Sequence, residues 1–329
     1  MSFKHFALAA ALSAIAFPTL AQDKPVLTVY TYDSFAAEWG PGPALKAGFE
    51  TTCGCTVNFS ASEDAISTLR KVQLEGATSP ADVVVGLDTA TAPEARKTGL
   101  FATHDLTLPT LAIDWADPDF VPFDYGYFAF VYNKEKTPNP PKSFEELIAL
   151  PPSFKIVLQD PRSSTPGLGN VIWIRTAYGD RAPKIWQGLK PHILTLSRGW
   201  SEAYGLFLDG QADMVLSYTT SPSYHAIAEQ DGKYAYAEFT EGYVPQVEVA
   251  GVLKTAKQPE LARQFLAYLV TPEAQAVIPT TNWMYPVLDM AETLPAGFGT
   301  PPANVLTLDE SVLDTSLKAW VDEALAALQ

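Results

Sequence analysis

The chain has 329 residues, of which 47% are hydrophobic and 12% aromatic, a composition that indicates a well-packed globular protein and excludes a disordered chain. Its formal net charge of −15 argues against nucleic acid as a partner and weakly favours a cationic ligand. The length is too great for one ordinary core and favours two domains.

The N-terminal segment, residues 1–21, has the pattern of a secretory signal peptide. A basic residue precedes an apolar stretch at residues 6–17 that is too short to span a bilayer, and Thr19 and Ala21 fit the small-x-small cleavage pattern. We expect a mature chain that starts at Gln22, with an uncleaved membrane anchor as the alternative. No later segment has the roughly twenty uninterrupted apolar residues of a transmembrane helix.

The first part of the mature chain alternates strands and helices. Strands are expected at residues 26–32, 56–60 and 81–88, and helices at residues 43–51 and 65–75. This alternation is typical of an open α/β sheet, in which ligands bind beyond the carboxyl ends of the strands. Tyr32, Asp64 and Asp88 lie at or just after such ends.

A crossing between two lobes is predicted at a loop, residues 120–124, followed by a strand at residues 125–132. The second lobe is expected to contain a helix at 143–150 with a capping box of Ser143 and Glu146, a strand at 155–159, a loop at 160–167, a helix-like run from Val171, a helix at 201–208 and a strand at 213–218.

The chain is expected to cross back near residues 243–249 and to complete the first lobe with helices at 259–270 and 272–278. The last segment, 309–328, has an apolar helical stripe that packs on a lobe. The expected division is a discontinuous lobe 1 (22–122 and 245–300), lobe 2 (123–244) and a C-terminal helical segment (301–329).

The sequence contains two cysteines, Cys53 and Cys55, separated by Gly54. Two extended residues span roughly 7 Å, slightly more than the usual Cα separation in a disulfide, so a bridge needs a bent backbone. Gly54 permits that bend, and an oxidising compartment favours a small disulfide ring. A metal site is disfavoured because no further ligands lie nearby, and a thiol nucleophile is the remaining alternative.

Four aromatic residues lie in loops or at the ends of predicted elements instead of periodic core positions: Trp200, Tyr218, Tyr224 and Trp283. Ordinary packing explains any one such ring, since aromatic side chains dominate protein cores. As a group they suggest a site for a flat cation, because an aromatic face attracts a desolvated cation by about 2 kcal/mol.

Two polar segments are candidates for further ligand contacts. Residues 163–167 offer hydroxyls and backbone amides that suit a phosphate or hydroxyl, or else form a simple helix cap. Asp64 follows Glu63, and this pair fits a ligand anchor and a solvated turn equally well.

Signals of catalysis are weak. The sequence lacks the zinc-protease, nucleophile-elbow, Walker A and dinucleotide-binding motifs. Its histidines are far apart, and His225, beside Tyr224, fits a packing or surface residue better than a base. We therefore expect no enzyme activity, no metal and no cofactor.

Six segments together resemble the periplasmic thiamine-binding proteins of Gram-negative ABC importers. They are residues 30–35, 122–128, 160–169, 199–205, 217–225 and 282–286. The similarity extends over nearly all of the mature chain, including Cys53 and Cys55, and is weakest beyond Leu288.

The resemblance implies a type II periplasmic-binding-protein fold: two α/β lobes, each an open mixed sheet flanked by helices, with a ligand cleft between them. It implies a periplasmic monomer that captures thiamine, thiamine monophosphate or thiamine diphosphate for a membrane permease with its ATPase. The implied ligand-binding residues are Tyr32, Asp64, Ala65, Ser164, Thr165, Trp200, Tyr218, Thr219, Thr220, Ser221, Tyr224 and Trp283. Ala65 stands where a related receptor has glycine.

The resemblance leaves two alternatives. Thiaminase I is similar in fold and acts on thiamine through a cysteine, but this sequence has no cysteine after Cys55. Receptors for ferric iron or polyamines share the broad fold, but iron receptors use adjacent tyrosines, whereas Tyr218 and Tyr224 are separated.

Overall fold

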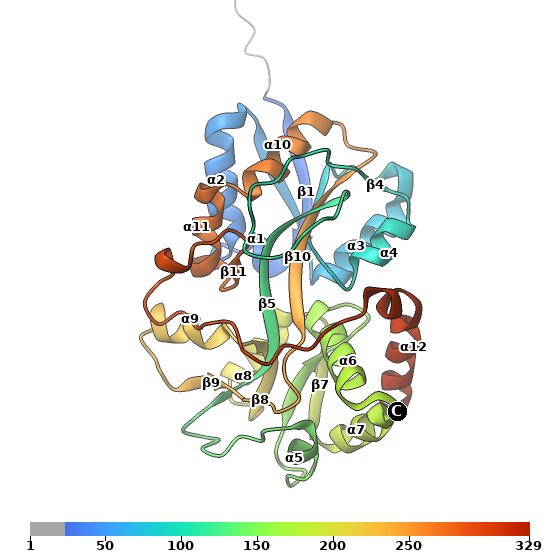
Figure 1. The fold of residues 1–329 in the computed structure, drawn as a ribbon, viewed down its shortest axis with the longest axis vertical. Helices are drawn as coiled ribbons and strands as arrows, with labels where there is room; N and C mark the ends of the chain where they lie inside the picture. Colours follow the sequence, from blue (N-terminus) through green and yellow to red (C-terminus); the bar gives the residue numbers. More distant parts are fainter. Residues whose placement is uncertain (1–23) are drawn as a thin grey trace, which may run out of the picture.

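The computed structural model describes residues 24–329, so the predicted signal peptide lies outside it. In this range no helix is both long and apolar enough to cross a membrane. Figure 1 shows two bodies, lobe 1 and lobe 2, joined by the long strands β5 and β10. Both strands run from one lobe into the other and pair side by side.

A single mixed sheet runs through both lobes in the order β2-β1-β3-β10-β5-β8-β6-β7. Strands β1, β2 and β3 are parallel, β10 is antiparallel to its neighbours β3 and β5, and β6, β7 and β8 are mutually parallel. The strands are β1 (Val26–Tyr32), β2 (Thr56–Ser62), β3 (Val83–Asp88), β4 (Phe101–Ala102), β5 (Phe120–Asn133), β6 (Ile156–Gln159), β7 (Ile193–Ser197), β8 (Met214–Tyr218), β9 (Tyr234–Tyr236), β10 (Pro245–Leu253) and β11 (Tyr285–Pro286).

Helices cover the sheet in both lobes (Figure 1). Those of lobe 1 are α1 (Asp33–Ala36), α2 (Pro41–Cys53), α3 (Ala65–Glu75), α4 (Ala92–Lys97), α10 (Pro259–Leu269) and α11 (Pro272–Thr281). Those on lobe 2 are α5 (Phe144–Ile148), α6 (Thr165–Tyr178), α7 (Ala182–Leu189), α8 (Trp200–Leu208), α9 (Ser221–Ile227) and α12 (Glu310–Leu328). The predicted α/β class with mixed sheets is confirmed.

The predicted loop at residues 120–124 is wrong, because β5 continues through it. Pro122 and Asp124 interrupt an apolar run and therefore suggested a break. In the structure, Val249 pairs with Pro122 and Glu248 with Asp124, so Phe123 is an extra residue in β5 and forms a bulge. A bulge accommodates proline without losing a ladder hydrogen bond.

Several other boundaries differ from the prediction. Helix α6 begins at Thr165 and not near Val171, with Pro166 in its first turn. The sequence analysis missed α7 and the edge strand β7, whose half-buried residues give only a short alternating pattern. Ser143 does cap α5, since its Oγ accepts a hydrogen bond from the Glu146 amide at 2.9 Å.

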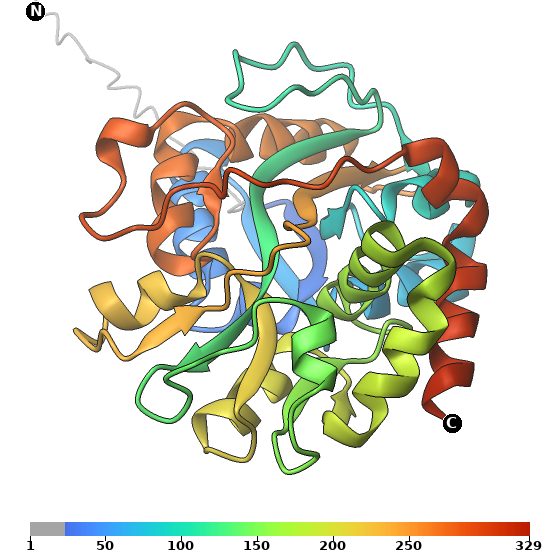
Figure 2. The ribbon, with the colours of Figure 1, turned by 60° about the horizontal axis from the view of Figure 1, so that its bottom comes forward.

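Each lobe has its own core. In lobe 1, Val29, Val85 and Phe265 are fully buried, and in lobe 2 Phe130, Phe144 and Trp173 are fully buried with ring centroids 5.0–6.1 Å apart. Helix α12 packs on lobe 2 against α6 and α7, where its residues Leu313 and Ala324 are buried (Figure 2).

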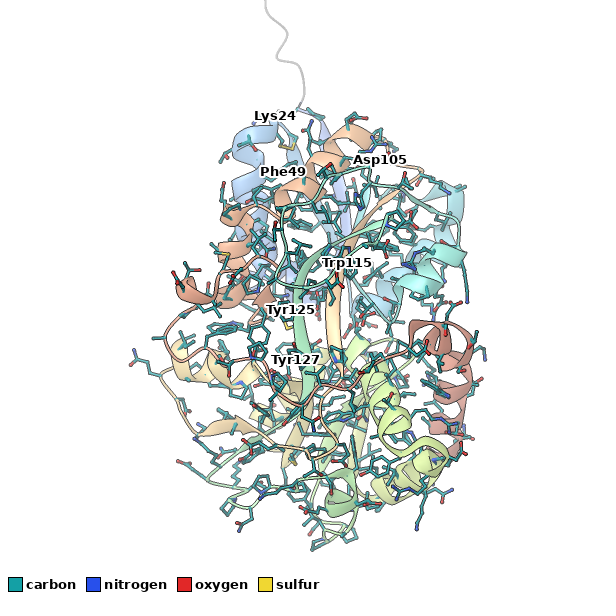
Figure 3. All side chains as sticks on the ribbon, in the orientation of Figure 1. Lys24, Phe49, Asp105, Trp115, Tyr125 and Tyr127 are labelled. Atoms are coloured by element: carbon teal, nitrogen blue, oxygen red, sulfur yellow. A yellow bond between two sulfur atoms is a disulfide. The ribbon has the colours of Figure 1, made fainter. Side chains whose placement is uncertain are left out.

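The segment 287–309, called here the strap, connects α11 in lobe 1 with α12 on lobe 2. Figure 2 shows it crossing the molecule over β5. The Tyr243 amide donates to the Asn304 carbonyl at 3.0 Å, and the Leu306 amide donates to the Tyr243 carbonyl at 2.8 Å. Tyr125 and Tyr127, which Figure 3 labels at the middle of the molecule, contact the Tyr285 ring just before the strap.

Cys53 and Cys55 form a disulfide with a Cα separation of 5.1 Å. Gly54 has φ 62° and ψ 22°, in the left-handed region where glycine is unstrained. The bridge therefore closes a ring at the end of α2, and it does so by the bend that the spacing required.

Gly86 in β3 allows Tyr32 to occupy its position at the end of β1. A Cβ on Gly86 would lie 2.3 Å from two carbons of the Tyr32 ring, and its φ of 103° is unfavourable for any other residue. The Tyr32 ring therefore rests directly against the β3 backbone.

We predict that Gly86→Ala lowers the free energy of unfolding by at least about 2 kcal/mol, because backbone strain and overpacking each cost about 1–3 kcal/mol. Urea unfolding measures this loss. Gly232→Ala is the control, since its Cβ would meet no atom within 4 Å. Equal stability of the two variants would contradict the contact between Tyr32 and Gly86.

Candidate functional site

A cavity of about 490 Å³ lies between the lobes, within the 300–1,000 Å³ typical of small-molecule sites. Its wall includes residues of α3, β10 and the end of α11 from lobe 1, and residues of α6, α8 and α9 from lobe 2. Nine of the predicted site residues line it: Tyr32, Asp64, Ala65, Thr165, Trp200, Tyr218, Ser221, Tyr224 and Trp283.

The other three predicted residues do not line the cavity. Ser164 is fully buried behind it, and its Oγ donates to Asp64 Oδ2 at 2.7 Å. Thr219 and Thr220 are buried in the turn between β8 and α9, where Thr220 occupies the N-cap position of α9. These three residues support the wall instead of forming it.

Trp200 and Tyr204 form an aromatic surface on the lobe 2 side. Their rings stack with centroids 4.8 Å apart at 23°, because one helical turn of α8 separates them. Trp200 Nε1 donates to Ser217 Oγ at 2.8 Å, which fixes the orientation of the indole. From lobe 1, the Trp39 ring lies 6.4 Å from Trp200 and is 56% exposed.

Tyr224 and Trp283 form an aromatic contact between the lobes, edge to face with centroids 5.4 Å apart. Trp283 has φ 55°, a left-handed conformation that costs a bulky residue about 1–3 kcal/mol. Its amide donates to the Ile278 carbonyl at 3.1 Å, at the end of α11. The fold therefore tolerates strain to direct this ring at the cavity.

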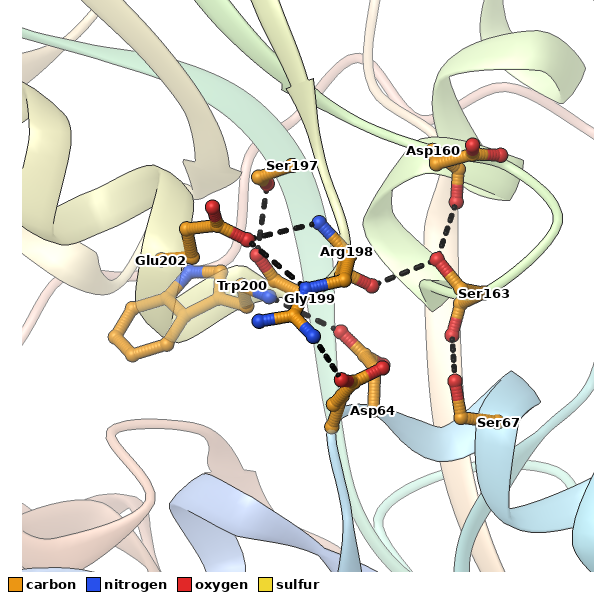
Figure 4. A network of polar contacts seen from close by, with 10 residues as sticks. Asp64, Ser67, Asp160, Ser163, Ser197, Arg198, Gly199, Trp200 and Glu202 are labelled. Atoms are coloured by element: carbon orange, nitrogen blue, oxygen red, sulfur yellow. Dashed lines mark hydrogen bonds and ion pairs between the residues drawn. The ribbon is translucent and has the colours of Figure 1, made fainter.

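Asp64 joins the lobes through its carboxylate (Figure 4). It is the N-cap of α3, and its Oδ1 accepts from the Ala65 amide at 2.7 Å. Four groups of lobe 2 also donate to it: Ser164 Oγ at 2.7 Å, the Thr165 amide and Thr165 Oγ1 each at 3.3 Å, and the Trp200 amide at 3.1 Å. Burial raises the pKa of Asp64, and these hydrogen bonds oppose the rise.

Glu63 and Asp64, for which the sequence suggested either a ligand anchor or a solvated turn, occupy two different environments. Asp64 is buried and hydrogen-bonded, so it is not part of a solvated turn. Glu63 is exposed and forms an ion pair with Arg198 of lobe 2. Ser67 of α3 donates to the Ser163 carbonyl, which extends the seam between the lobes (Figure 4).

Three buried carboxylates form a second polar feature, which we call the acidic row. Glu248 of β10 pairs in register with Asp88 of β3 on one side and Asp124 of β5 on the other. Their exposed fractions are 6%, 2% and 0%, and none of them forms a salt bridge in residues 24–329. Like charges directly opposite on neighbouring strands repel.

Neutral donors satisfy part of the acidic row. Tyr32 Oη donates to Glu248 Oε2 at 2.7 Å, and Asn282 Nδ2 donates to Asp124 Oδ2 at 2.6 Å. Asp88 accepts from the Thr91 amide at 2.9 Å, and burial raises its pKa to about 6. Burial raises the pKa of both Asp124 and Glu248, and repulsion from Asp124 raises that of Glu248 further.

The sequence analysis missed several residues of the site, among them Trp39, Tyr204, Glu248 and Asn282, which all line the cavity. Trp39 lies in a Gly/Pro-rich loop, the same signal that identified the other aromatic residues. An acidic residue inside an apolar strand is the signal for Glu248, because such a side chain is almost never fully buried unless it is paired.

The charged side chains that line the cavity, Asp64 and Glu248, are both acidic. Among residues 24–329, no Lys, Arg or His lines the cavity, and no cluster of side chains could hold a metal ion. Neither cysteine is among the lining residues. His225 is fully buried and hydrogen-bonded to Tyr204 and Glu229, so of the two predicted environments, packing and surface, it occupies the first.

We predict that Asp64→Ala opens the ligand-free protein, because it removes the acceptor of the amides and hydroxyls of lobe 2. Small-angle X-ray scattering should show an increased radius of gyration, and stability should fall by about 1–3 kcal/mol. Glu63→Gln is the matched control, since an exposed ion pair contributes about 0–1 kcal/mol. An unchanged radius in a folded Asp64→Ala variant would rule out a closing role.

We also predict that stability falls as the pH rises. Carboxyl pKa values raised by folding mean that the folded state binds more protons than the unfolded state, from about pH 4 up to the raised pKa values. In that window the free energy of unfolding declines by up to about 1.4 kcal/mol per pH unit for each proton. Asp124→Asn should flatten the decline, measured by urea unfolding between about pH 5 and 8.

Glu260→Gln, an exposed carboxyl on α10, is the control for this measurement. Its curve should run parallel to that of the unmodified protein. The same parallel course for Asp124→Asn would exclude Asp124 from the titration.

Comparisons with known proteins agree with this architecture. The thiamine-binding periplasmic protein of Escherichia coli (strain K12) is 51% identical over 304 residues, covering 91% of this chain and 92% of that protein. The corresponding protein of Brucella melitensis is 48% identical over 311 residues, covering 93% of each.

A solved structure described as a periplasmic thiamin binding protein has a TM-score of 0.90 at 49% identity and covers 95% of this chain and 99% of its own. Iron-bound HitA from Pseudomonas aeruginosa, at 20% identity and a TM-score of 0.72, shares the fold alone. The profile of bacterial extracellular solute-binding proteins matches residues 30–276. The resemblance noted in the sequence is therefore confirmed, and the chain belongs to the bacterial extracellular solute-binding protein family.

Proposed function

We propose that this protein is a periplasmic receptor that binds thiamine between its lobes and delivers it to an ABC importer. One observation carries the proposal: the cavity has aromatic walls, a buried carboxylate and, within the described part of the chain, no basic residue, in a chain about half identical to thiamine-binding periplasmic proteins. Thiamine has two flat rings, joined by a methylene group, and one of them carries a permanent positive charge, which matches each of these properties.

The aromatic rings account for binding of the thiazolium and aminopyrimidine rings. Trp200 and Tyr204 present one surface, and Tyr224 and Trp283 another. A desolvated cation gains about 2 kcal/mol from each aromatic face. Two faces therefore supply about 4 kcal/mol, close to a thousandfold in affinity.

The ligand also joins the lobes, because residues of both contact the cavity. Binding should therefore favour the closed form, in which Asp64 accepts hydrogen bonds from Ser164, Thr165 and Trp200. We propose that the remaining predicted residues of the wall, Tyr32, Ala65, Tyr218 and Ser221, contact the ligand directly and that Thr219 and Thr220 hold the wall in place.

The finer parts of the proposal concern the ligand's phosphate esters, the partners and the location. Helices α6 and α8 begin at the cavity wall, with Thr165 and Trp200, and the positive ends of their helix dipoles suit the hydroxyethyl end or a phosphate of thiamine mono- or diphosphate. The Thr165 and Trp200 amides themselves donate to Asp64. We propose a monomer in the periplasm that is exported by a cleaved signal peptide, residues 1–21, and is recognised by a permease with its ATPase.

Two other classes of function are less well supported. A thiaminase-like enzyme needs a nucleophile, but the two cysteines of the sequence are joined to each other outside the cavity wall. A ferric-iron receptor needs several oxygen or nitrogen ligands at one point, and Tyr218 and Tyr224 are separated by a turn of α9. We therefore propose that the protein does not act on its ligand chemically.

Titration calorimetry tests the proposal with thiamine, both phosphate esters, spermidine and ferric citrate. We predict strong binding of thiamine and at least about tenfold weaker binding by Trp200→Ala, which removes one aromatic face of about 2 kcal/mol. Strong heat with spermidine or ferric citrate alone would overturn the assignment.

Trp320→Phe on α12 serves as the control, since Trp320 packs on lobe 2 outside the cavity. Its affinity should equal that of the unmodified protein. Unchanged affinity in a folded Trp200→Ala variant would remove Trp200 from the site, and release of free pyrimidine and thiazole would indicate an enzyme.

A further inference from the structure

The acidic row places three buried carboxylates on neighbouring strands, where their negative charges would repel one another. Glu248 lies between Asp88 and Asp124 across neighbouring strands, and all three are more than nine-tenths buried. Two ionised carboxylates so close in a desolvated site repel strongly, and each loses the hydration of its charge.

No basic side chain of residues 24–329 compensates this charge. The titratable groups that face Glu248 are Tyr32 from β1, Asp88 from β3, Asp124 from β5, Tyr218 from β8 and Asp64 at the start of α3. All are acids, and burial raises the pKa of both tyrosines, which stay neutral. None of the carboxylates pairs with Lys, Arg or His in the described residues.

Two observations connect this charge to the cavity. Glu248 is 6% exposed and that small exposed part forms cavity wall, so a ligand meets it directly. Asp124 Oδ1 is fully buried and has no hydrogen-bond partner in residues 24–329, although Oδ2 accepts from Asn282. A lone buried carboxylate oxygen is expensive when ionised, but is readily tolerated as a neutral acid.

We infer that Glu248 and Asp124 share a proton in the empty receptor and release it when the cationic ring of the ligand binds beside Glu248. The ligand's charge then takes the place of the proton. One proton passes to solvent for each cation bound, and no covalent bond of the ligand changes.

The same pair then acts as a selectivity determinant. A neutral ring of the same shape does not favour the ionised form of the two carboxyl groups. Such a ligand therefore makes the aromatic contacts but gains no ionic attraction. The hydrogen-bond partners allow the exchange, because Tyr32 and Asn282 donate to whichever oxygens carry charge. This inference rests on the proposed function, since it assumes a cationic ligand in this cavity.

Proton release is measured by calorimetry of the unmodified protein with thiamine at about pH 7 in two buffers of different ionisation enthalpy. We expect release of up to one proton per thiamine and an affinity that rises by up to about tenfold per pH unit between about pH 6 and 8. The probe for charge is 3-deazathiamine, in which a neutral thiophene replaces the thiazolium, and it should release none.

Glu248→Gln and Asp124→Asn are the test variants, and Glu260→Gln is the surface control. Each test variant should lose the proton release and weaken thiamine binding by at least about tenfold near pH 8, where the pair is ionised in the complex. Binding of 3-deazathiamine should change little in either.

The outcomes distinguish failure of the shared proton from failure of the proposed receptor function. Thiamine binding without proton release, or equal release by thiamine and 3-deazathiamine, would overturn the shared proton and leave the receptor function standing. Undiminished release in both variants would assign the proton to other groups and also overturn it. Absence of any thiamine binding by the unmodified protein would overturn the proposed function itself.

Discussion

The pairing of β5 with β10 is the interaction on which the rest of the molecule depends. These antiparallel strands belong to both lobes, so the same ladder of hydrogen bonds holds the lobes together and sets their relative position. The ladder also places Glu248 opposite Asp124, in the middle of the molecule. The same pairing of strands therefore connects the lobes and brings the buried carboxylates of the site together.

Around this ladder, the closed arrangement is held by contacts of different kinds. The Asp64 carboxylate links the starts of α3, α6 and α8 through directional hydrogen bonds, each worth about 0.5–1.5 kcal/mol net, or more to a charged group. The Tyr224–Trp283 pair adds apolar contact between the lobes. Such modest terms suit a receptor, because a closed form that is too stable would not release its ligand.

The sequence predicted the sheet and part of the cavity wall for identifiable reasons. Continuous apolar strands and aromatic residues at strand ends are local signals, and Tyr32, Tyr218 and Trp200 were found from them and from the resemblance. Asp124 shows the limit of local reasoning: inside an apolar strand it suggested a loop, whereas the structure places it within β5, opposite Glu248. Its partner Glu248 lies 124 positions away along the numbering, so their contact depends on strand pairing that no local pattern contains.

The packing of α12 on lobe 2 has a consequence for how the chain folds. Lobe 1 needs β10 and α11 near the end of the sequence, and lobe 2 needs Leu313 and Ala324 of α12 to complete its core. Neither lobe is therefore encoded by a contiguous stretch that could finish early, and contacts between distant residues slow folding. Both cores remain incomplete until almost the whole length of the chain is available. This delay favours an extended state during passage across a membrane.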